Sequence, residues 1–507
     1  MKPLFPVTIL CLLATWARAD VKLPAIFSDH MVLQAGAEVP VWGWAEPGEA
    51  VTVSVADQTM TATTDAQGKW TAKLGKLKAG DEPQTLTIKG ANTLVVKDVL
   101  VGEVWLASGQ SNMAFTFKSG AYPERMSQEA NLPKIRVFTV KQHSTRTPQT
   151  NCEGSWIIAS PETVGNFSAV AYFFGQELHN ELKAPVGMVV SSWGGTDIAA
   201  WTSEEVQTPN PALKAQLEAW KASEKTYDPV KAKALNDKQI EAWNKKVAAA
   251  KKAGNSFPRK PSLKRQPSLD QNHPGNLYNG MIAPLIPYAL RGAIWYQGEH
   301  NCSSVEKAKL YATQLPLLVQ DWRTRWGQEF PFAWVQLPNF EQAAFRPLVR
   351  EAMLKSLAIK NTGMAVTIDI GEAKDNHPKN KPEVGRRLSL WALGTVYGKA
   401  VPAISGPLPL IREVRENHIA VTFKHANEGL VAKGAELKGF EIAGADRVWK
   451  PATAKIAGDE VLISNPEVPK PAAVRYSWAS YPDGNLYNGA GLPASPFRSD
   501  DWEVTAK

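Results

Sequence analysis

Four short polar motifs each follow a predicted apolar strand. Ser111 lies in Gly-Gln-Ser-Asn, directly after the apolar run 99–107. The other three motifs follow the runs 186–191, 292–296 and 364–368, and they are Trp193-Gly194-Gly195, Gln297-Gly298-Glu299 and Asp375-Asn376-His377. The carboxyl ends of parallel strands meet at one edge of a sheet. We therefore expect these four motifs to lie close together.

These residue types can carry out acyl transfer. That reaction needs a hydroxyl nucleophile, an imidazole that takes its proton, and a carboxylate that orients the imidazole. Ser111 supplies the hydroxyl and His377 the imidazole, while Asp375 stands two residues before His377. The sequence therefore predicts Ser111, His377 and Asp375 as the catalytic residues.

The reaction also needs donors for the negative oxygen that develops on the substrate. Glycine allows a backbone N–H to approach closely, so we expect the oxyanion hole to combine the Ser111 N–H, the N–H of Gly194 or Gly195, and the Gln297 amide. Neighbouring residues are expected to support the site or bind substrate: Gln110, Asn112, Trp193 and Glu299. His300 beside Glu299 is a poor metal-ligand set, and we expect neither a metal nor another cofactor.

Each motif alone is also consistent with a structural role. Gly-Gln-Ser-Asn has the composition of an ordinary turn, and an isolated histidine is often a surface residue. The argument depends on the joint occurrence of the four motifs after four strands.

Between residues 98 and 400 the sequence alternates strands with amphipathic helices. The strands are nearly continuous apolar runs, as in a parallel sheet that is covered on both faces. They are predicted at 99–107, 135–140, 186–191, 292–296, 332–337 and 364–368, and the helices at 169–182, 309–326, 347–359 and 383–397. This pattern predicts a three-layer α/β domain.

The flanking regions have a different pattern. Residues 20–97 contain short alternating strands separated by turn residues, which predicts a β-sandwich module. Residues 401–507 again have β character, and we expect a second β module that packs on the α/β domain, because no Gly/Ser linker precedes it. Residues 204–271 interrupt the α/β pattern with a Lys- and Ala-rich helical insertion, which has the character of a lid.

Charge and targeting signals limit the partners and the location of the 507-residue chain. The formal net charge is +8, and residues 204–275 hold 14 Lys and Arg against 8 Asp and Glu. A mixed helical run of this kind indicates a solvated face rather than a nucleic-acid groove.

Residues 1–19 resemble a secretory signal peptide cut before Asp20, and no later segment is apolar enough to span a membrane. We expect export to the periplasm or the medium. The oligomeric state is undetermined, and Cys152 and Cys302 are either a disulfide or two buried thiols.

The motifs together resemble the sialate O-acetylesterase family, a branch of the SGNH hydrolases. The blocks that carry the resemblance are 109–113, 192–196, 295–299 and 375–381, with further similarity at 27–34 and 492–498. The resemblance covers nearly the whole chain after residue 19 except the insertion at 204–271. It implies a flavodoxin-like α/β/α sheet with β-rich accessory modules, and metal-independent removal of acetyl groups from sugar hydroxyls.

The sequence departs from the wider pattern at three places. Ala114-Phe115 replaces a frequent Glu after the first block, the acid and base are spaced Asp-x-His, and Gln297 stands where typical SGNH hydrolases use asparagine. The resemblance implies O-acetylated sialic acid or acetylated xyloglucan or xylan as the substrate. Two other functions remain open at this point: a non-catalytic glycan-binding protein, and another SGNH activity such as lipid-ester hydrolysis.

Overall fold

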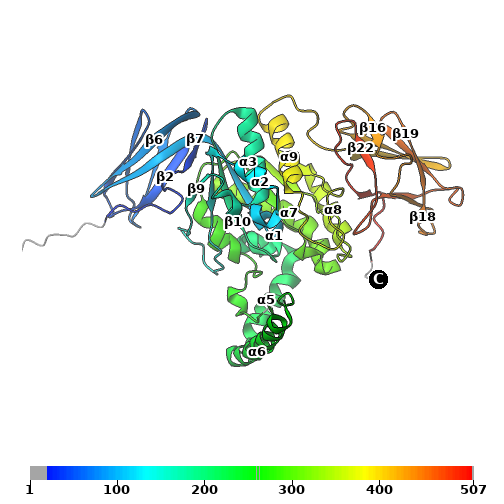
Figure 1. The fold of residues 1–507 in the computed structure, drawn as a ribbon, viewed down its shortest axis with the longest axis horizontal. Helices are drawn as coiled ribbons and strands as arrows, with labels where there is room; N and C mark the ends of the chain where they lie inside the picture. The colour runs from blue at the N-terminus through cyan, green and yellow to red at the C-terminus, as the bar shows by residue number, and fades with distance from the viewer. Residues whose placement is uncertain (1–19, 259, 262, 505–507) are drawn as a thin grey trace, which may run out of the picture.

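Strand β7 (Thr93–Gly109) joins two parts of the protein (Figure 1). The computed structural model describes residues 20–258, 260, 261 and 263–504, so the expected signal peptide lies outside the described residues. The first half of β7 pairs antiparallel with β6 (Gly80–Lys89), and its second half pairs parallel with β10 (Val186–Ser192) and β11 (Gly292–Tyr296). The boundary expected at residue 97 falls inside this continuous strand.

The protein is a mixed α/β structure with a large central sheet. Its strand order is β13-β12-β11-β7-β10-β8-β9, and all neighbouring pairs are parallel except β8 with β9. The four strands not yet given are β8 (Leu132–Thr139), β9 (Trp156–Ala159), β12 (Phe332–Val335) and β13 (Thr362–Ala365). Strands β8 and β10 lie on one side of β7, and β11, β12 and β13 lie on the other; ligands of open α/β sheets bind where the strand order reverses in this way. The carboxyl end of β7 is that point.

Two pairs of helices pack beside the sheet. Helix α3 (Ala169–Leu182) packs against α9 (Lys381–Trp391), and α7 (Val305–Trp326) packs against α8 (Arg346–Lys355). Gly385 permits the close approach of α9 to α3, since a Cβ there would lie 2.7 Å from Phe173 Cβ. The predicted bounds of α3 are confirmed, whereas α8 and α9 end earlier than predicted and continue as 3₁₀ and π turns over Ser356–Ala358 and Ala392–Val396.

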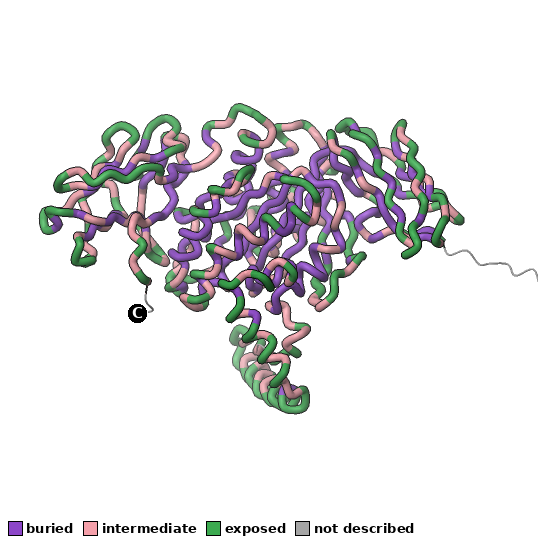
Figure 2. The backbone as a smooth tube through the Cα atoms, turned by 180° about the vertical axis from the view of Figure 1, so that it is seen from behind, coloured by how far each residue is buried: buried purple, intermediate pink, exposed green. Residues whose placement is uncertain are grey.

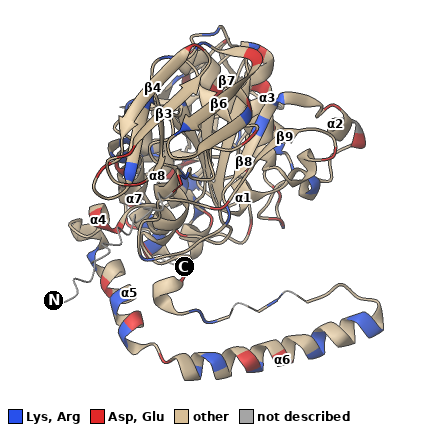
Figure 3. Ribbon diagram, turned by 90° about the vertical axis from the view of Figure 1, so that its left-hand side faces the viewer, with Lys and Arg blue, Asp and Glu red and all other residues tan. Residues whose placement is uncertain are grey.

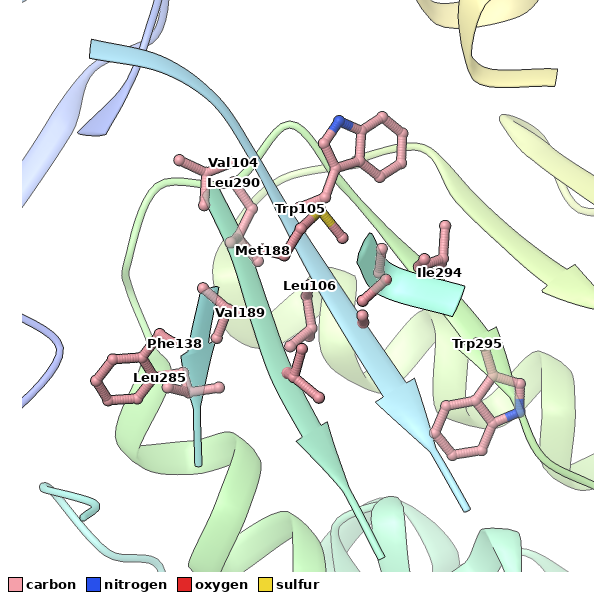
Figure 4. Close-up of a cluster of buried hydrophobic side chains, with 14 of the residues drawn as sticks. Val104, Trp105, Leu106, Phe138, Met188, Val189, Leu285, Leu290, Ile294 and Trp295 are labelled. Carbon is pink, nitrogen blue, oxygen red and sulfur yellow. The ribbon is translucent and has the colours of Figure 1, made fainter. Parts of the chain in front are cut away.

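The core lies on the central strands. Every residue of β10, β11 and β12 is buried, which explains why these strands are apolar throughout instead of alternating. Figure 4 shows side chains of β7, β10 and β11 in this core, among them Leu106, Val189 and Ile294. The tube in Figure 2 shows buried residues concentrated in the same central region. The antiparallel edge strand β9 was not predicted, because four residues carry too little periodicity.

The insertion forms a helical arm that projects from the α/β part (Figure 1). It contains α4 (Glu204–Gln207), α5 (Lys214–Thr226) and α6 (Pro229–Ala253). Helix α6 begins at the cap residue Asp228, and Ala232 is its one buried residue. Lys, Arg, Asp and Glu are distributed along the length of this helix (Figure 3). Half of the 14 basic residues of the insertion thus lie on an exposed helix, after which the chain returns to the central part.

The two flanking regions are rich in strands, as expected. In the N-terminal region, β2 pairs with β5, while β3, β4, β6 and β1 join the sheet of β7. The bounds are β1 (Val32–Gln34), β2 (Val39–Trp44), β3 (Ala50–Val55), β4 (Gln58–Thr63) and β5 (Lys69–Leu74). The C-terminal region holds two four-stranded sheets, β14-β15-β20-β19 and β18-β17-β21-β23, and the pair β16-β22. Its bounds are β14 (Leu408–Arg415), β15 (His418–Lys424), β16 (Leu430–Ala432), β17 (Phe440–Ala443), β18 (Lys450–Pro451), β19 (Thr453–Ala457), β20 (Glu460–Ser464), β21 (Ala473–Tyr476), β22 (Leu486–Asn488) and β23 (Phe497–Arg498).

The C-terminal region is packed on the α/β part and not tethered to it. Arg350 of α8 is fully buried, and its guanidinium donates to the backbone oxygens of Ala479 and Ser480 at 2.8 and 3.2 Å. Asn339 Nδ2 also donates to Pro482 O at 2.9 Å. Buried polar groups that find partners in this way fix the relative position of the segments they join.

Candidate active site

The chain turns sharply between β7 and the short helix α1 (Ser111–Ala114). Gly109 has φ +140°, and a Cβ at this position would lie 2.1 Å from Tyr296 O. The turn therefore requires glycine. Gln110 N donates to Tyr296 O at 2.9 Å, so the turn is fixed to the end of β11. Ser111 is consequently the first residue of α1 and lies at the carboxyl end of the sheet.

The structure brings the predicted nucleophile and base into contact. Ser111 Oγ and His377 Nε2 are 2.8 Å apart, although 266 positions separate them in the chain. This distance is that of a hydrogen bond between a nucleophile and its base. The ring of His377 also stacks on Phe115, with 6.5 Å between the ring centroids and 17° between the planes. Phe115, which stands at one of the departures from the family pattern, thus contacts the predicted base.

Asp375 lies beside His377 but holds its backbone more tightly than its ring. Asp375 Oδ1 accepts a hydrogen bond from His377 N at 2.8 Å, whereas the distance from the same oxygen to His377 Nδ1 is 3.6 Å. The Asp375 side chain is 50% exposed. The carboxylate thus shapes the loop that carries the imidazole, and it needs only a small movement to reach Nδ1.

The glycine motif borders the nucleophile. A Cβ on Gly194 would lie 3.1 Å from Ser111 Cβ, and Gly195 has φ +68°. Trp193 N donates to Gly109 O at 3.0 Å, which ties this loop to the turn before Ser111. The Ser111 N–H stands in the first turn of a helix, where backbone N–H groups have no partner within the helix. The same Cβ position on Gly194 lies 3.8 Å from Ser111 N, so Gly194 adjoins the backbone as well as the side chain of the candidate nucleophile.

Gln297 does not have the expected geometry of an oxyanion donor. Its Nε2 donates to Thr196 O at 2.8 Å and to Asn301 Oδ1 at 2.7 Å. An amide nitrogen carries two hydrogens, so both are used within the protein. This fully buried side chain thus holds together the loops that follow β10 and β11, and its donation to the substrate stays a prediction.

The predicted support residues connect three of the loops. Gln110 Oε1 accepts hydrogen bonds from Gly298 N at 3.3 Å and His300 N at 3.2 Å. Asn112 Nδ2 donates to Glu299 Oε1 and, at 3.0 Å, to Asn376 O. Asn112 thereby links the nucleophile helix to the loop of the catalytic base.

A buried lysine that sequence reasoning missed completes this cluster. Lys381, the first residue of α9, is 0% exposed and donates from Nζ to Asn112 Oδ1. Its Nζ also lies 4.9 Å from the Phe115 ring centroid and 5.2 Å from that of Tyr296. Burial lowers the pKa of the Lys381 ammonium to about 7, although the negative charge of Glu299 opposes the shift. A lysine at a helix start carries no signal in the sequence that marks it as buried.

A cleft of about 1090 Å³ opens above Ser111. It is lined by Ser111, His377 and Gly194, and also by Phe340 and His300. The returning segment of the insertion lines the same cleft, with Lys260, Pro261, Leu263, Lys264 and Arg265. This segment is more than 100 positions away from Ser111 and His377 in the chain, so its position over the site could not be read from the sequence.

The returning segment is attached to the glycine loop. Gln271 Nε2 donates to Gly194 O at 3.1 Å, and Arg265 donates to Gln271 Oε1 at 2.7 Å. The Arg265 guanidinium also lies over the Trp193 ring, 5.9 Å from its centroid. Trp193, expected as a support or substrate residue, therefore packs against the insertion.

Three further expectations concern groups outside this cluster. Among the described residues, no set of three or more His, Cys, Asp or Glu side chains is arranged to hold a metal ion. Cys152 and Cys302 are both buried free thiols, and burial raises the pKa of each to about 12. Within the described part of the chain, no helix has the length and apolar character needed to cross a membrane.

Comparison with known proteins supports an esterase. The family described as "Carbohydrate esterase, sialic acid-specific acetylesterase" matches residues 101–250 and 264–392, which is more than half of the chain. The chain belongs to this family. The match continues to residue 250, so it includes most of the segment that we expected to lie outside the resemblance.

Similar proteins cover almost the full length of this family member. The sialate O-acetylesterase of Mus musculus is 29% identical, over 98% of this chain and 97% of its own length, and that of Homo sapiens is 28% identical, over 94% and 92%. A crystal structure of a carbohydrate acetylesterase from Xanthomonas citri is 34% identical, with a TM-score of 0.79 over 95% of this chain and 100% of that one. The protein is therefore a carbohydrate esterase hydrolase, as its motifs predicted.

Proposed function

We propose that this esterase is an exported carbohydrate O-acetylesterase that forms an acetyl intermediate on Ser111. The observation that carries the proposal is the 2.8 Å contact between Ser111 Oγ and His377 Nε2 within the cleft. A hydroxyl in this position can transfer its proton to the imidazole as it attacks an ester carbonyl.

In the first half-reaction, Ser111 Oγ attacks the acetyl carbonyl carbon and His377 Nε2 takes the hydroxyl proton. The negative charge that develops on the carbonyl oxygen faces the N–H groups of Ser111 and Gly194. Loss of one such donor typically costs about 2.7–4 kcal/mol of transition-state stabilisation. As the tetrahedral intermediate breaks down, the bond to the sugar oxygen breaks, and that oxygen leaves with the proton held by His377.

In the second half-reaction, His377 takes a proton from water, and the resulting hydroxide attacks the acetyl-Ser111 carbonyl. The bond to Ser111 Oγ then breaks, the serine regains its proton from His377, and acetate is released. During both half-reactions the Asp375 carboxylate favours the charged imidazolium.

Measurement of acetate release tests this mechanism. We expect the wild-type protein to hydrolyse 4-nitrophenyl acetate and the Ser111→Ala variant to lose the activity. Ser54→Ala is the matched control, since Ser54 is a hydroxyl of β3 that bonds only to Thr59 in the N-terminal region. Full activity in Ser111→Ala, or none in the wild-type protein, would contradict the proposal. Mass spectrometry of a rapidly quenched reaction should find an acetyl group on the peptide that contains Ser111.

The substrate is proposed to be an O-acetylated glycan, either acetylated sialic acid or an acetylated hemicellulose such as xyloglucan or xylan. The relatives named sialate O-acetylesterase support the first, and the carbohydrate acetylesterase from Xanthomonas citri is compatible with either. Comparison of kcat/KM for 9-O-acetylated sialic acid, acetylated xyloglucan and acetylated xylan decides between them.

Export is proposed from the basic start and apolar run of residues 1–19. Expression in a bacterial host followed by cell fractionation tests it. We expect the protein in the periplasm or medium with Asp20 as its first residue, and intact residues 1–19 on cytoplasmic protein alone would contradict export.

A further inference from the structure

His300 is a second imidazole that faces the catalytic cleft, and the mechanism above does not use it. It lines the cleft together with Ser111 and His377, and its side chain is 35% exposed. Its backbone N–H donates to Gln110 Oε1 at 3.2 Å. Because Gln110 directly precedes the nucleophile, His300 is fixed relative to Ser111 by one side chain.

The ring of His300 is held by a buried carboxylate. His300 Nδ1 lies 2.8 Å from Asp197 Oδ1, and Asp197 is 3% exposed. Asp197 Oδ2 accepts from Lys307 Nζ at 2.9 Å, and Asp197 N donates to Asn272 Oδ1 at 2.7 Å. A carboxylate bonded on both oxygens leaves little freedom to the imidazole that it holds.

The charge of Asp197 fixes which ring nitrogen faces substrate. Burial alone would raise the pKa of this carboxyl, but the hydrogen bond from His300 and the charges of His300 and Lys307 outweigh it and lower the pKa. An anionic carboxylate requires a proton on Nδ1. Nε2 is then the polar atom of the ring that remains for a ligand in the cleft.

We propose that His300 binds the sugar part of the substrate, with Nε2 hydrogen-bonded to a hydroxyl close to the acetylated oxygen. This inference rests on the proposed function, because it assigns a contact to the glycan of that reaction. His377 already supplies the base at 2.8 Å from Ser111 Oγ, so a second, rigidly held imidazole suits recognition. A polar group that is fixed before binding loses little conformational entropy when the ligand arrives. Asp197 and Lys307 act through His300 as positioning residues.

The test compares two esters that differ in whether a sugar is present. For wild-type and His300→Ala proteins, kcat and KM are measured on 4-nitrophenyl acetate and on the best acetylated glycan. The deciding quantity is kcat/KM on the glycan divided by kcat/KM on the aryl acetate. We expect this ratio to be at least tenfold lower in His300→Ala than in the wild-type protein, mainly because KM for the glycan is higher. Asp197→Asn should lower the same ratio by a smaller factor, because the imidazole remains but is less firmly oriented.

Two outcomes would overturn the proposal. An unchanged ratio shows that His300 does not contact the sugar, and an equal loss on both esters shows that it supports the site as a whole. His418→Ala is the control, since His418 begins β15 in the C-terminal region and should leave the ratio unchanged. Thermal unfolding of each variant shows that it is folded. Failure of the proposed function is distinct, because wild-type protein would then release acetate from neither ester.

Discussion

Two histidines line the same cleft, each beside an aspartate, and the two pairs are built differently. In the pair predicted to be catalytic, Asp375 is 50% exposed and lies 3.6 Å from His377 Nδ1. In the other pair, Asp197 is 3% exposed and lies 2.8 Å from His300 Nδ1. The pair that the sequence predicts as acid and base is thus the looser of the two.

The difference follows from where each carboxylate stands in the chain. Asp375 is two residues from His377 in one exposed loop, so its shortest contact is to the backbone of its neighbour. Asp197 is 103 positions from His300, and the two meet because the loops after β10 and β11 lie side by side. A short loop gives a pair that can adjust during a reaction, while two packed loops give a rigid pair. This difference fits the two proposed roles, proton transfer for His377 and sugar binding for His300.

The largest expected effect in this comparison comes from the catalytic imidazole. His377→Ala removes the proton acceptor and should lower kcat by at least about 10⁴-fold, on aryl and glycan esters alike. Steady-state acetate release on both esters measures the loss. If His300→Ala matched this loss on the aryl ester, the assignment of the two imidazoles would be reversed.

Asp375→Asn should have a smaller effect on the rate. Because the carboxylate is half exposed and 3.6 Å from Nδ1, we expect kcat to fall by about 10- to 100-fold, less than is typical for a buried orienting acid. A loss equal to that of His377→Ala would show instead that Asp375 closes onto the ring when substrate binds. The kcat of the two variants, measured side by side, distinguishes these cases.

Asp197→Asn should cost stability more than Asp375→Asn does. The buried carboxylate joins His300 and Lys307, and its loss should lower the free energy of unfolding by about 1–3 kcal/mol. The exposed Asp375 should contribute less than about 1 kcal/mol. Urea unfolding of the two variants at neutral pH measures both values. Equal losses of unfolding free energy would contradict the expectation that the buried carboxylate contributes more than the exposed one.

The same pair predicts how stability depends on acid. The pKa of Asp197 is lower in the folded protein than its ordinary value of 3.8, so the unfolded chain takes up a proton first as the pH falls. The stabilising contribution is complete above that ordinary value and is lost as the pH falls toward the folded pKa. Wild-type protein should therefore lose its advantage over Asp197→Asn in acid, as measured by unfolding at pH 3 and pH 6.

Each pair also has a lysine nearby, and the lysine behind His377 makes stability depend on pH in the same direction but over a higher range of pH. Burial lowers the pKa of Lys381 from 10.5 to about 7, so between these values the unfolded chain holds the extra proton. Stability then increases with pH in that range. The difference in unfolding free energy between wild type and Lys381→Met should rise by about 2 kcal/mol from pH 7 to pH 9. Denaturant unfolding at the two values checks this, and a flat difference would show that Lys381 stays charged.

Sequence patterns predicted much of the sheet and part of the site. The strand β11 and the helix α3 have their predicted bounds, since long apolar or amphipathic runs report burial directly. Ser111 and His377 were predicted as partners because both follow parallel strands, and they meet at 2.8 Å. The partners of the Gln297 amide in the folded protein could not be predicted, because its residue type shows that it can donate but not which acceptor lies nearest.

The sequence by itself determined the reactive groups, the family and the edge of the sheet on which the groups gather. Residue types and local periodicity are properties of the chain, and both can be read from a single sequence. Only the tertiary structure decided that Asp197 holds His300, that Lys381 is buried behind the loop that carries His377, and that Lys264 and Arg265 line the cleft. These contacts join loops that are distant in sequence, and the packing of the complete fold sets their distances and burial.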